Sequence, residues 1–348
     1  MKKILVTGGS GFIGKNFIIN HLNSYDNAIL NFDKLTYAAS TEFFNSDVKL
    51  KNYEFVRGDI SSKGDVESAF QSFSPDIVVN FAAETHVDRS IDAPKNFINT
   101  NILGTFNLLN ISLKYSSSKN SFMFIHVSTD EVFGSLETNS NPFIEESPYK
   151  PSSPYSATKA SSDHLVNAWH LTYNLPTVIT NCSNNYGPYQ FPEKLIPLII
   201  ANCIDEKPLP VYGDGLNIRD WLFVKDHCDA LNLVIKDGLP GENFNIGGSN
   251  EVKNIDIVKK ICAILDDIKP RQDGSYSDLI TYVHDRPGHD FRYGIDSSKI
   301  QDRLGWKPNE SLDTGLKKTI DWYIKNEQWW RKIQSVAYGQ ERLGLLKK

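Results

Sequence analysis

The sequence predicts an α/β protein built on a doubly wound parallel sheet, with a second, smaller C-terminal lobe. Three observations support this prediction. A glycine-rich turn follows the first strand-like segment, strand-like and helix-like segments alternate through the first half of the chain, and the composition changes near residue 180. At 348 residues, the chain is also longer than a typical single domain.

The N-terminus has the pattern of a dinucleotide-binding Rossmann domain. Lys3 to Thr7 indicates a short buried strand, and we expect a helix to begin near Phe12. Between them, Gly8, Gly11 and Gly14 form G-x-x-G-x-x-G. Glycines let the backbone approach a pyrophosphate, which the free N–H groups of a helix N-terminus stabilise. A set of ordinary turn glycines is the simpler alternative.

A carboxylate follows the second expected strand. Ile29 to Phe32 is strand-like and ends in Asp33, nineteen residues after Gly14. There a carboxylate accepts hydrogen bonds from ribose hydroxyls and repels a 2′-phosphate, so we expect NAD in preference to NADP. The alternative is a surface aspartate.

Three further strands are each followed by residues suited to a ligand crevice. We expect these strands at residues 53–57, 77–81 and 122–127. In open parallel sheets ligands bind beyond the carboxyl ends of the strands, so the endings belong to one crevice. They are Gly58, Asp59 and Ile60, then Ala82, Ala83 and Glu84, then Ser128, Thr129 and Asp130.

Two long helices are expected at Lys95 to Tyr115 and at Tyr155 to Tyr173. Each is expected to have one buried stripe. Apolar positions left exposed on them would suit a contact between helices of two copies, so we expect a homodimer.

The second half has no glycine-rich loop of its own. Helices are expected at 195–204, 255–266 and 312–326, and strands at 220–224 and 243–246. We therefore assign residues 1–180 to an NAD-binding Rossmann domain, with a returning segment at about 218–248. Residues 181–217 and 249–348 form the second lobe, which closes over the cofactor domain with the substrate between them.

Composition excludes several classes of protein. A net charge of −5 argues against nucleic acid as a partner. No stretch approaches the roughly 18 consecutive apolar residues that span a bilayer, and the start does not resemble a signal peptide, so we expect a cytoplasmic protein without a membrane partner. The cysteines show no C-x-x-C spacing and the histidines no H-x-x-x-H pair, so we expect no metal site and interpret the cysteines as small buried hydrophobes: Cys182, Cys203, Cys228 and Cys262.

Two short runs carry the chemistry. Tyr155 and Lys159 are four residues apart on one helix face, where the ammonium can hold the pKa of the phenol down toward working pH. Thr129 is followed by Asp130 and Glu131, which add an acid and a second base. Hydride transfer needs one base, whereas elimination of water needs an acid and a base as well. The residues predict oxidation coupled to dehydration.

Each run has a simpler reading. The carboxylates could be a solvated loop pair or a helix cap, and Y-x-x-x-K often marks only a helix face. His126, inside an apolar strand, is expected to be a satisfied core histidine, and Arg219 or Arg286 taken singly would be surface ion-pair residues.

Seven runs distributed along the chain form a specific pattern: residues 7–14, 82–90 (AAETHVDRS), 128–134 (STDEVFG), 155–159, 184–197 (NNYGPYQFPEKLIP), 219–224 and 285–289 (DRPGH). With these runs the chain resembles the dTDP-glucose 4,6-dehydratases of the extended short-chain dehydrogenase/reductase superfamily. The resemblance covers nearly the whole length, and the Thr129–Glu131 run is its most discriminating part.

The resemblance implies a lyase mechanism. Tyr155, beside Lys159, takes the proton of the glucose 4-hydroxyl while the C4 hydride passes to NAD, and Thr129 hydrogen-bonds at the same oxygen. Glu131 then removes the C5 proton, and protonated Asp130 donates to the departing C6 hydroxyl. The hydride returns to C6 and Glu131 reprotonates C5, which gives a 4-keto-6-deoxy sugar nucleotide.

The resemblance also implies binding roles. For the pyrophosphate of the substrate, it suggests Arg219, because a guanidinium can donate two parallel hydrogen bonds to it. The implied cofactor residues are Gly8, Gly11, Phe12, Ile13, Gly14, Asp33, Lys34, Thr36, Asp59, Ile60, Ala82, Ala83, Glu84, Thr100, Tyr155, Lys159 and Asn185. The implied substrate residues are Thr85, Thr129, Asn184, Lys194, Leu195, Pro210, Tyr212, Arg219, Asn254, Arg286 and His289.

Other functions stay open from the sequence. A UDP-glucose 4,6-dehydratase or a nucleotide-sugar 4-epimerase is the nearest alternative, and a non-catalytic NAD-binding protein is a more distant one. The sequence does not decide between thymine and uracil in the region of residues 210–212, nor whether the product feeds rhamnose or another deoxysugar.

Overall fold

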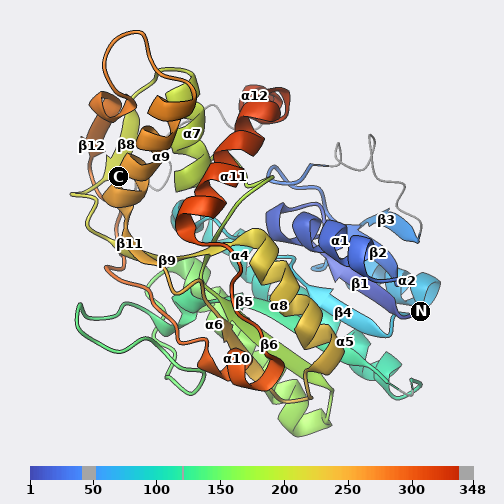
Figure 1. The fold of residues 1–348 in the computed structure, drawn as a ribbon. Coiled ribbons are helices and arrows are strands. Elements are labelled where there is room, and N and C mark those ends of the chain that lie inside the picture. Colours follow the sequence, from blue (N-terminus) through green and yellow to red (C-terminus); the bar gives the residue numbers. More distant parts are fainter. Residues whose placement is uncertain (41–51, 120, 337–348) are drawn as a thin grey trace.

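The computed structural model describes residues 1–40, 52–119 and 121–336, and Figure 1 shows their arrangement. A seven-stranded sheet forms the centre of the first part, with the order β10-β6-β5-β4-β1-β2-β3 and every pair parallel. This confirms the predicted doubly wound α/β fold. Its strands are β1 (Lys3–Thr7), β2 (Ala28–Asp33), β3 (Tyr53–Arg57), β4 (Ile77–Asn80), β5 (Met123–Thr129), β6 (Thr177–Cys182) and β10 (Asn243–Ile246).

Helices cover both faces of this sheet. On one face α1 (Phe12–Ser24), α8 (Val224–Asp237) and α10 (Ser298–Leu304) enclose one apolar core. On the other, α2 (Lys63–Phe73), α5 (Thr105–Ser116) and α6 (Pro154–Tyr173) enclose another. Both layers are needed because strands such as β1 and β4 are buried on both faces.

The helix expected at Lys95 to Tyr115 is divided in three. It consists of α4 (Pro94–Phe97), a π-helical segment η2 (Ile98–Gly104) and α5. A short helix, α3 (Val87–Asp92), precedes it. Hydrophobic periodicity detects the apolar stripe of this helix but not its wider π-helical turn. Gly104, at the end of that turn, lies tight against Ile60: a Cβ added to Gly104 would lie 2.5 Å from the Ile60 side chain.

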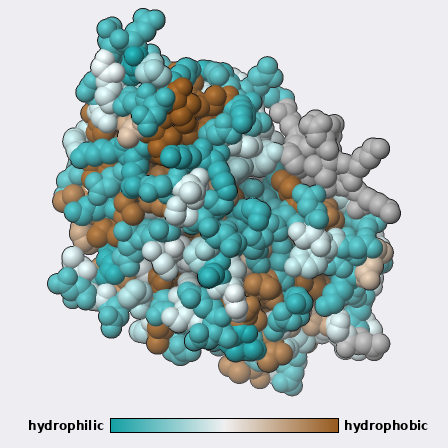
Figure 2. Space-filling view, viewed as in Figure 1, coloured by the Kyte–Doolittle hydropathy of each residue, from teal (hydrophilic) through white to brown (hydrophobic). Residues whose placement is uncertain are grey.

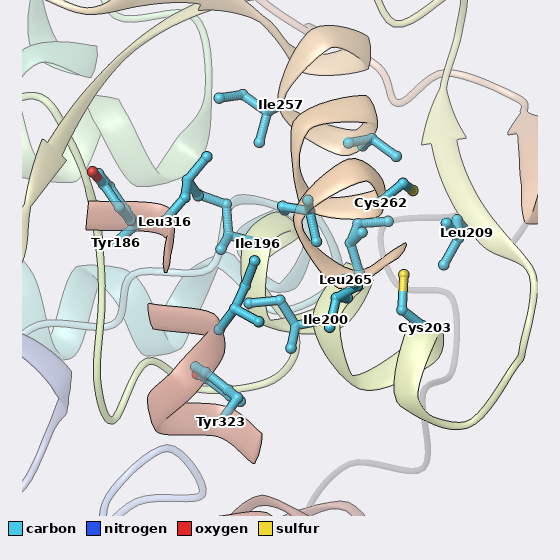
Figure 3. Packing of buried hydrophobic residues seen from close by; sticks show 14 of the residues in the cluster. Tyr186, Ile196, Ile200, Cys203, Leu209, Ile257, Cys262, Leu265, Leu316 and Tyr323 are labelled. Atoms are coloured by element: carbon cyan, nitrogen blue, oxygen red, sulfur yellow. The ribbon is translucent and has the colours of Figure 1, made fainter. Parts of the chain in front are cut away.

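The second lobe has its own core of apolar side chains. In Figure 3 side chains such as Ile200 of α7 (Leu195–Ile204), Leu265 of α9 (Asn254–Ile268) and Leu316 of α11 (Leu312–Lys325) pack together. Two small sheets border this core. The remaining elements are β7 (Asn184–Tyr186), β9 (Ile218–Phe223) and β11 (Glu251–Lys253) in one sheet, β8 (Leu209–Tyr212) and β12 (Ile280–Val283) in the other, the 3₁₀ turns η3 (Asp130–Phe133) and η4 (Tyr276–Leu279), and α12 (Glu327–Val336).

The segment expected to return to the first domain is shared between the sheets. Strand β9 pairs with β7 and β11 in a small sheet, whereas β10 is a strand of the main sheet and α8 packs on one face of that sheet. The domain limits at residue 180 stay a prediction, and residues 337–348 of the expected lobe lie outside the described residues.

Three general features complete the fold. All four cysteines are buried and free, as expected. Across the described residues, no helix is both long and apolar enough to cross a membrane. In the view of Figure 2 the surface is mostly hydrophilic, and hydrophobic residues gather over the second lobe near α7.

Candidate active site

The glycine loop between β1 and α1 is built for a close ligand. Gly8 has a φ of +69°, which favours glycine, and a Cβ on Gly14 would lie 2.4 Å from the carbonyl oxygen of Gly8. Gly11 is the N-cap of α1, and no side chain caps the helix there. The first N–H groups of α1 are therefore available to an anion.

Asp33 at the end of β2 holds this loop in place. Its carboxylate accepts hydrogen bonds from the backbone N–H of Ser10 at 2.9 Å and of Leu35 at 2.7 Å. Burial raises its pKa, and these two hydrogen bonds oppose the rise. Next to it, Lys34 forms an ion pair with Asp59 at 2.7 Å.

A first cavity of about 300 Å³ extends from the glycine loop along the carboxyl edge of the sheet. Every residue expected to bind the cofactor lines it, as do Thr85 and the five expected catalytic residues. Besides the glycine loop and the catalytic residues, its lining includes Asp33, Lys34, Thr36, Asp59, Ile60, Ala82, Ala83, Glu84, Thr100 and Asn185.

The catalytic residues come together at the end of β5. This strand runs two residues further than expected, so that Thr129 is its last residue and Asp130 and Glu131 begin the turn η3. The Oγ1 of Thr129 accepts a hydrogen bond from the N–H of Glu131 and donates one to Oδ1 of Asp130, both at 3.3 Å. Tyr155 lies in the first turn of α6, and its phenol interacts with the Thr129 hydroxyl.

The capping of α6 fixes the position of Tyr155. Ser153 is the N-cap, and it forms a capping box with Ser156. Pro154 starts the helix, and Ser90 on α3 accepts a hydrogen bond from the N–H of Tyr155 at 3.2 Å. The start of α6 and one contact from α3 therefore hold the backbone of Tyr155 in place.

The expected effect of Lys159 on Tyr155 is not what the structure shows. The pKa of Tyr155 is raised well above its ordinary value, mainly by burial and then by the nearby carboxylate of Glu131, while the hydrogen bond with Thr129 opposes the rise. The Nζ of Lys159 donates instead to the carbonyl oxygen of Val127 at 2.9 Å, and burial lowers its pKa. Proximity in sequence did not predict this direction because it takes no account of desolvation.

A buried polar cluster lies behind Lys159. His126 is within hydrogen-bond distance of Asn80 and of Ser162, and its Nε2 is 3.3 Å from Oδ1 of Asp163. Asp163 also accepts a hydrogen bond from Ser128 at 2.8 Å. The pKa of His126 is lowered to about 4, mainly by burial, which agrees with the expected core histidine.

The two carboxyl groups of the site are both shifted toward the protonated form. Burial raises the pKa of Asp130 well above its ordinary value, and Glu131 and Asp220 add to the effect. Burial also raises the pKa of Glu131, which Arg286 and Lys194 oppose. Among the described residues, Oδ2 of Asp130 is buried without a hydrogen-bond partner. A proton on Asp130 is therefore favoured by its surroundings.

A second cavity of about 330 Å³ continues from the first into the lobe. The two share Glu131, Asn184 and Lys194 among their lining residues. Within the described chain, the side-chain oxygens of Asn184 and Asn254 and the Nε of Arg286 are buried without hydrogen-bond partners. The other expected substrate residues in its lining are Leu195, Pro210, Tyr212, Arg219 and His289.

Arg219 is already engaged by the backbone. Its guanidinium donates to the carbonyl oxygens of Ile218, Asp290 and Phe291 and stacks on the ring of Tyr293, with 4.2 Å between the guanidinium carbon and the ring centroid. It lines the second cavity, and burial lowers its pKa.

Several lining residues were missed by the sequence analysis. The carboxylate of Glu193 accepts hydrogen bonds from Tyr37 at 2.9 Å and from Arg89 at 3.1 Å, and so joins the loop after β2 to α3. A signal was present for Glu193, which lies inside the 184–197 run. Asp88 also lies inside a quoted run, at residues 82–90, whereas for Tyr293 the sequence offered no comparable signal. The missed residues also include Gln190 and Trp221.

The residues of the first cavity fit NAD. The uncapped start of α1 suits the pyrophosphate, and the glycines there leave no side chain in its way. Asp33 is near this loop and carries two oxygens with capacity beyond their backbone hydrogen bonds. Together these features favour a dinucleotide with unmodified ribose hydroxyls.

Comparisons with known proteins agree with this geometry. Residues 5–319 match the family model described as GDP-mannose 4,6 dehydratase. The chain is 53% identical, over 99% of both chains, to a probable dTDP-glucose 4,6-dehydratase from Sinorhizobium fredii. A dTDP-glucose 4,6-dehydratase from Streptomyces venezuelae, solved with NAD and TYD bound, has a TM-score of 0.86 and 40% identity, covering 95% of this chain and 99% of that one.

The fold is also shared with an epimerase. The UDP-glucose 4-epimerase from Thermotoga maritima, solved with UDP-glucose, has a TM-score of 0.82 and 28% identity, covering 93% of this chain and 99% of that one. The fold therefore does not by itself distinguish elimination from epimerisation.

Proposed function

The chain belongs to the dTDP-glucose 4,6-dehydratase family, and from this premise we propose that it converts dTDP-glucose into dTDP-4-keto-6-deoxyglucose with NAD as its cofactor. The observation that carries this proposal is the meeting of Tyr155 with Asp130 and Glu131 in one cavity. Epimerisation at C4 needs a single base, whereas loss of water also needs an acid and a second base.

The chain's own residues supply the proton transfers. NAD, when bound in the first cavity, would supply the hydride acceptor and donor for this reaction. Tyr155 takes the proton of the 4-hydroxyl, with Thr129 hydrogen-bonded at the same place. The resulting C4 ketone acidifies C5–H, and Glu131, whose raised pKa makes it a stronger base, removes that proton.

The acid is Asp130. Burial and the nearby carboxylates favour its protonated form, from which it can donate to the C6 oxygen as that group leaves as water. Glu131 then returns its proton to C5. Substrate would lie with its sugar between Tyr155 and Glu131 and its diphosphate toward Lys194 and Arg286 in the second cavity.

A product assay with dTDP-glucose and UDP-glucose side by side tests this function. We expect the 4-keto-6-deoxy sugar from dTDP-glucose, seen by nuclear magnetic resonance, with no accumulation of free NADH. Equal or faster turnover of UDP-glucose would favour the UDP-glucose 4,6-dehydratase. Inversion at C4 without loss of water would identify an epimerase.

We also propose that two copies pair through α4, η2, α5 and α6. On these elements Ile98, Leu103 and Phe106 are exposed, as are Leu171 and Tyr173 on α6. An aromatic series from Phe106 through Trp169 to Tyr173 joins the two helices into one apolar face. Leu103→Glu should shift the mass measured by light scattering from dimer to monomer.

The four free thiols agree with a reducing compartment, so we place the enzyme in the cytoplasm.

A further inference from the structure

The proposed reaction leaves two groups in the wrong protonation state. Over one turnover Tyr155 gains the proton of the 4-hydroxyl, and Asp130 loses the proton that leaves in water. Glu131 takes the C5 proton and gives it back. The next turnover therefore requires one proton to move from Tyr155 to Asp130, and this requirement rests on the proposed function.

Both groups are remote from bulk water. Tyr155 is 7% exposed, Asp130 2% and Thr129, which lies between them, 8%. An unpaired charge in surroundings that exclude water has a high free energy, so releasing an isolated proton there is unfavourable. A route through hydrogen bonds between the two groups avoids that cost.

Thr129 has the right set of contacts for such a route. A hydroxyl offers one donor and two acceptor positions. The Oγ1 of Thr129 accepts from the N–H of Glu131 and donates to Oδ1 of Asp130, and it also forms a hydrogen bond with the phenol oxygen of Tyr155 that lowers the pKa of the phenol. When Tyr155 is neutral, its O–H can donate to the second acceptor position of Oγ1. The N–H of Glu131 keeps the hydroxyl in place, so its proton points toward the acid.

We propose that the Thr129 hydroxyl returns the proton from Tyr155 to Asp130 after each turnover. The phenol O–H breaks as a new O–H forms on Oγ1, and the former Thr129 proton moves to Oδ1 of Asp130. Tyr155 ends as a phenolate and Asp130 as a carboxylic acid. No proton is gained or lost by the site. The raised pKa of Asp130, caused by burial and by Glu131 and Asp220, favours this transfer, whereas the raised pKa of the Tyr155 phenol opposes it.

The test compares the first turnover with later ones. Thr129→Val removes the hydroxyl and keeps the shape, and Thr129→Ser keeps the hydroxyl. Thr180→Val, at a fully buried threonine on β6 outside both cavities, is the matched control. Each NAD-loaded variant is mixed with dTDP-glucose in a rapid-quench instrument, once with enzyme in excess and once with substrate in excess.

In Thr129→Val, we expect the steady-state rate to fall at least about tenfold more than the single-turnover rate, because only later turnovers need the returned proton. Product should appear as a burst of one equivalent per site and then slowly. Thr129→Ser and Thr180→Val should show no such burst. Thr129→Ala serves the same purpose if the valine variant does not fold.

Three results would overturn the inference. If both rates fall equally in Thr129→Val, the hydroxyl acts only on the bound sugar. If neither falls, the proton returns by another route, and if Thr129→Ser shows the same burst, the hydroxyl is not the cause. Failure of the proposed function is distinguishable, because the wild-type enzyme would then form no 4-keto-6-deoxy product in either experiment.

Discussion

Burial shifts the pKa of the acidic groups at one end of the cleft and of the basic groups at the other end in opposite directions. At the catalytic floor, formed by Thr129, Asp130, Glu131, Tyr155 and Lys159, burial raises the pKa of both carboxyl groups and of the phenol. The nucleotide end is formed by Lys194, Arg219, Arg286 and His289. There burial lowers the pKa of Lys194, Arg219 and His289.

This difference teaches how the site separates chemistry from binding. Desolvation disfavours whichever form of a group is charged. At the catalytic floor it favours the protonated form of Asp130, the proposed acid, and makes the carboxylate of Glu131 a stronger base. At the nucleotide end it disfavours the charged forms of Lys194 and Arg219, which a bound diphosphate would stabilise. Substitutions at the catalytic floor should therefore change rates, and substitutions at the nucleotide end should change affinity.

Tyr155→Phe should have the largest effect. It removes the base for the 4-hydroxyl, and we expect kcat to fall by about 10²- to 10⁴-fold with little change in the Kd of dTDP. Steady-state kinetics and calorimetry measure the two quantities. Tyr173→Phe, at the other end of α6, is the control and should keep wild-type kcat. A large loss of dTDP affinity in Tyr155→Phe would break the separation.

Arg286→Ala should have the converse effect. A hydrogen bond to a charged group contributes about 1.5–3 kcal/mol, so we expect the Kd of dTDP to rise roughly 10- to 150-fold. The single-turnover rate at saturating substrate should change far less. Arg271→Ala, at an arginine of the same lobe outside both cavities, should leave the Kd unchanged. An unaltered Kd in Arg286→Ala would place the diphosphate elsewhere.

Gly14→Ala tests the part of the cleft that uses backbone instead of charge. Its Cβ would lie 2.4 Å from the carbonyl oxygen of Gly8, so we expect a loss of about 1–3 kcal/mol in stability, seen by denaturant unfolding, and weaker NAD binding. Gly64→Ala on α2 is the control, since its Cβ would meet no atom within 4 Å. That change should stabilise by about 0.4–1 kcal/mol. Equal stability of both variants would contradict the tight loop.

The smallest effect expected is on pH dependence. The pKa of His289 is lowered to about 4 by burial and by Arg286 and Arg219, so its ring stays neutral at higher pH. The Kd of dTDP-glucose should therefore change less than about twofold between about pH 7.5 and about pH 5.5, where an ordinary histidine would gain charge. By contrast, kcat should fall as pH falls through the raised pKa of Glu131, which must be ionised to act as a base. Tighter binding at the lower pH that His289→Gln abolishes would contradict a neutral His289.

The catalytic floor was accessible to sequence analysis because each part is local. Thr129 is the last residue of β5, and Tyr155 follows a helix start that Ser153 and Pro154 mark in the sequence. Strand ends in a parallel sheet share one edge, so two short runs are enough to place these groups together.

The nucleotide end was less accessible because its contacts cross long stretches of chain. Beside Lys194, the carboxylate of Glu193 accepts hydrogen bonds from Tyr37 and Arg89, although 156 residues separate Tyr37 from Glu193. The backbone carbonyls that engage Arg219 come from residues 290 and 291, and neither has a side-chain signal for this role. The direction of the shift at Tyr155 was also out of reach, because it depends on burial, which spacing does not give.

The most direct test of the central claim is Glu131→Gln incubated with dTDP-glucose and NAD. The variant keeps the shape of the side chain and removes the base that starts elimination. We expect reduced cofactor to accumulate on the enzyme, seen by absorbance, while no 4-keto-6-deoxy sugar forms. Formation of that product at the wild-type rate would contradict the assignment of elimination to the carboxylates at the end of β5.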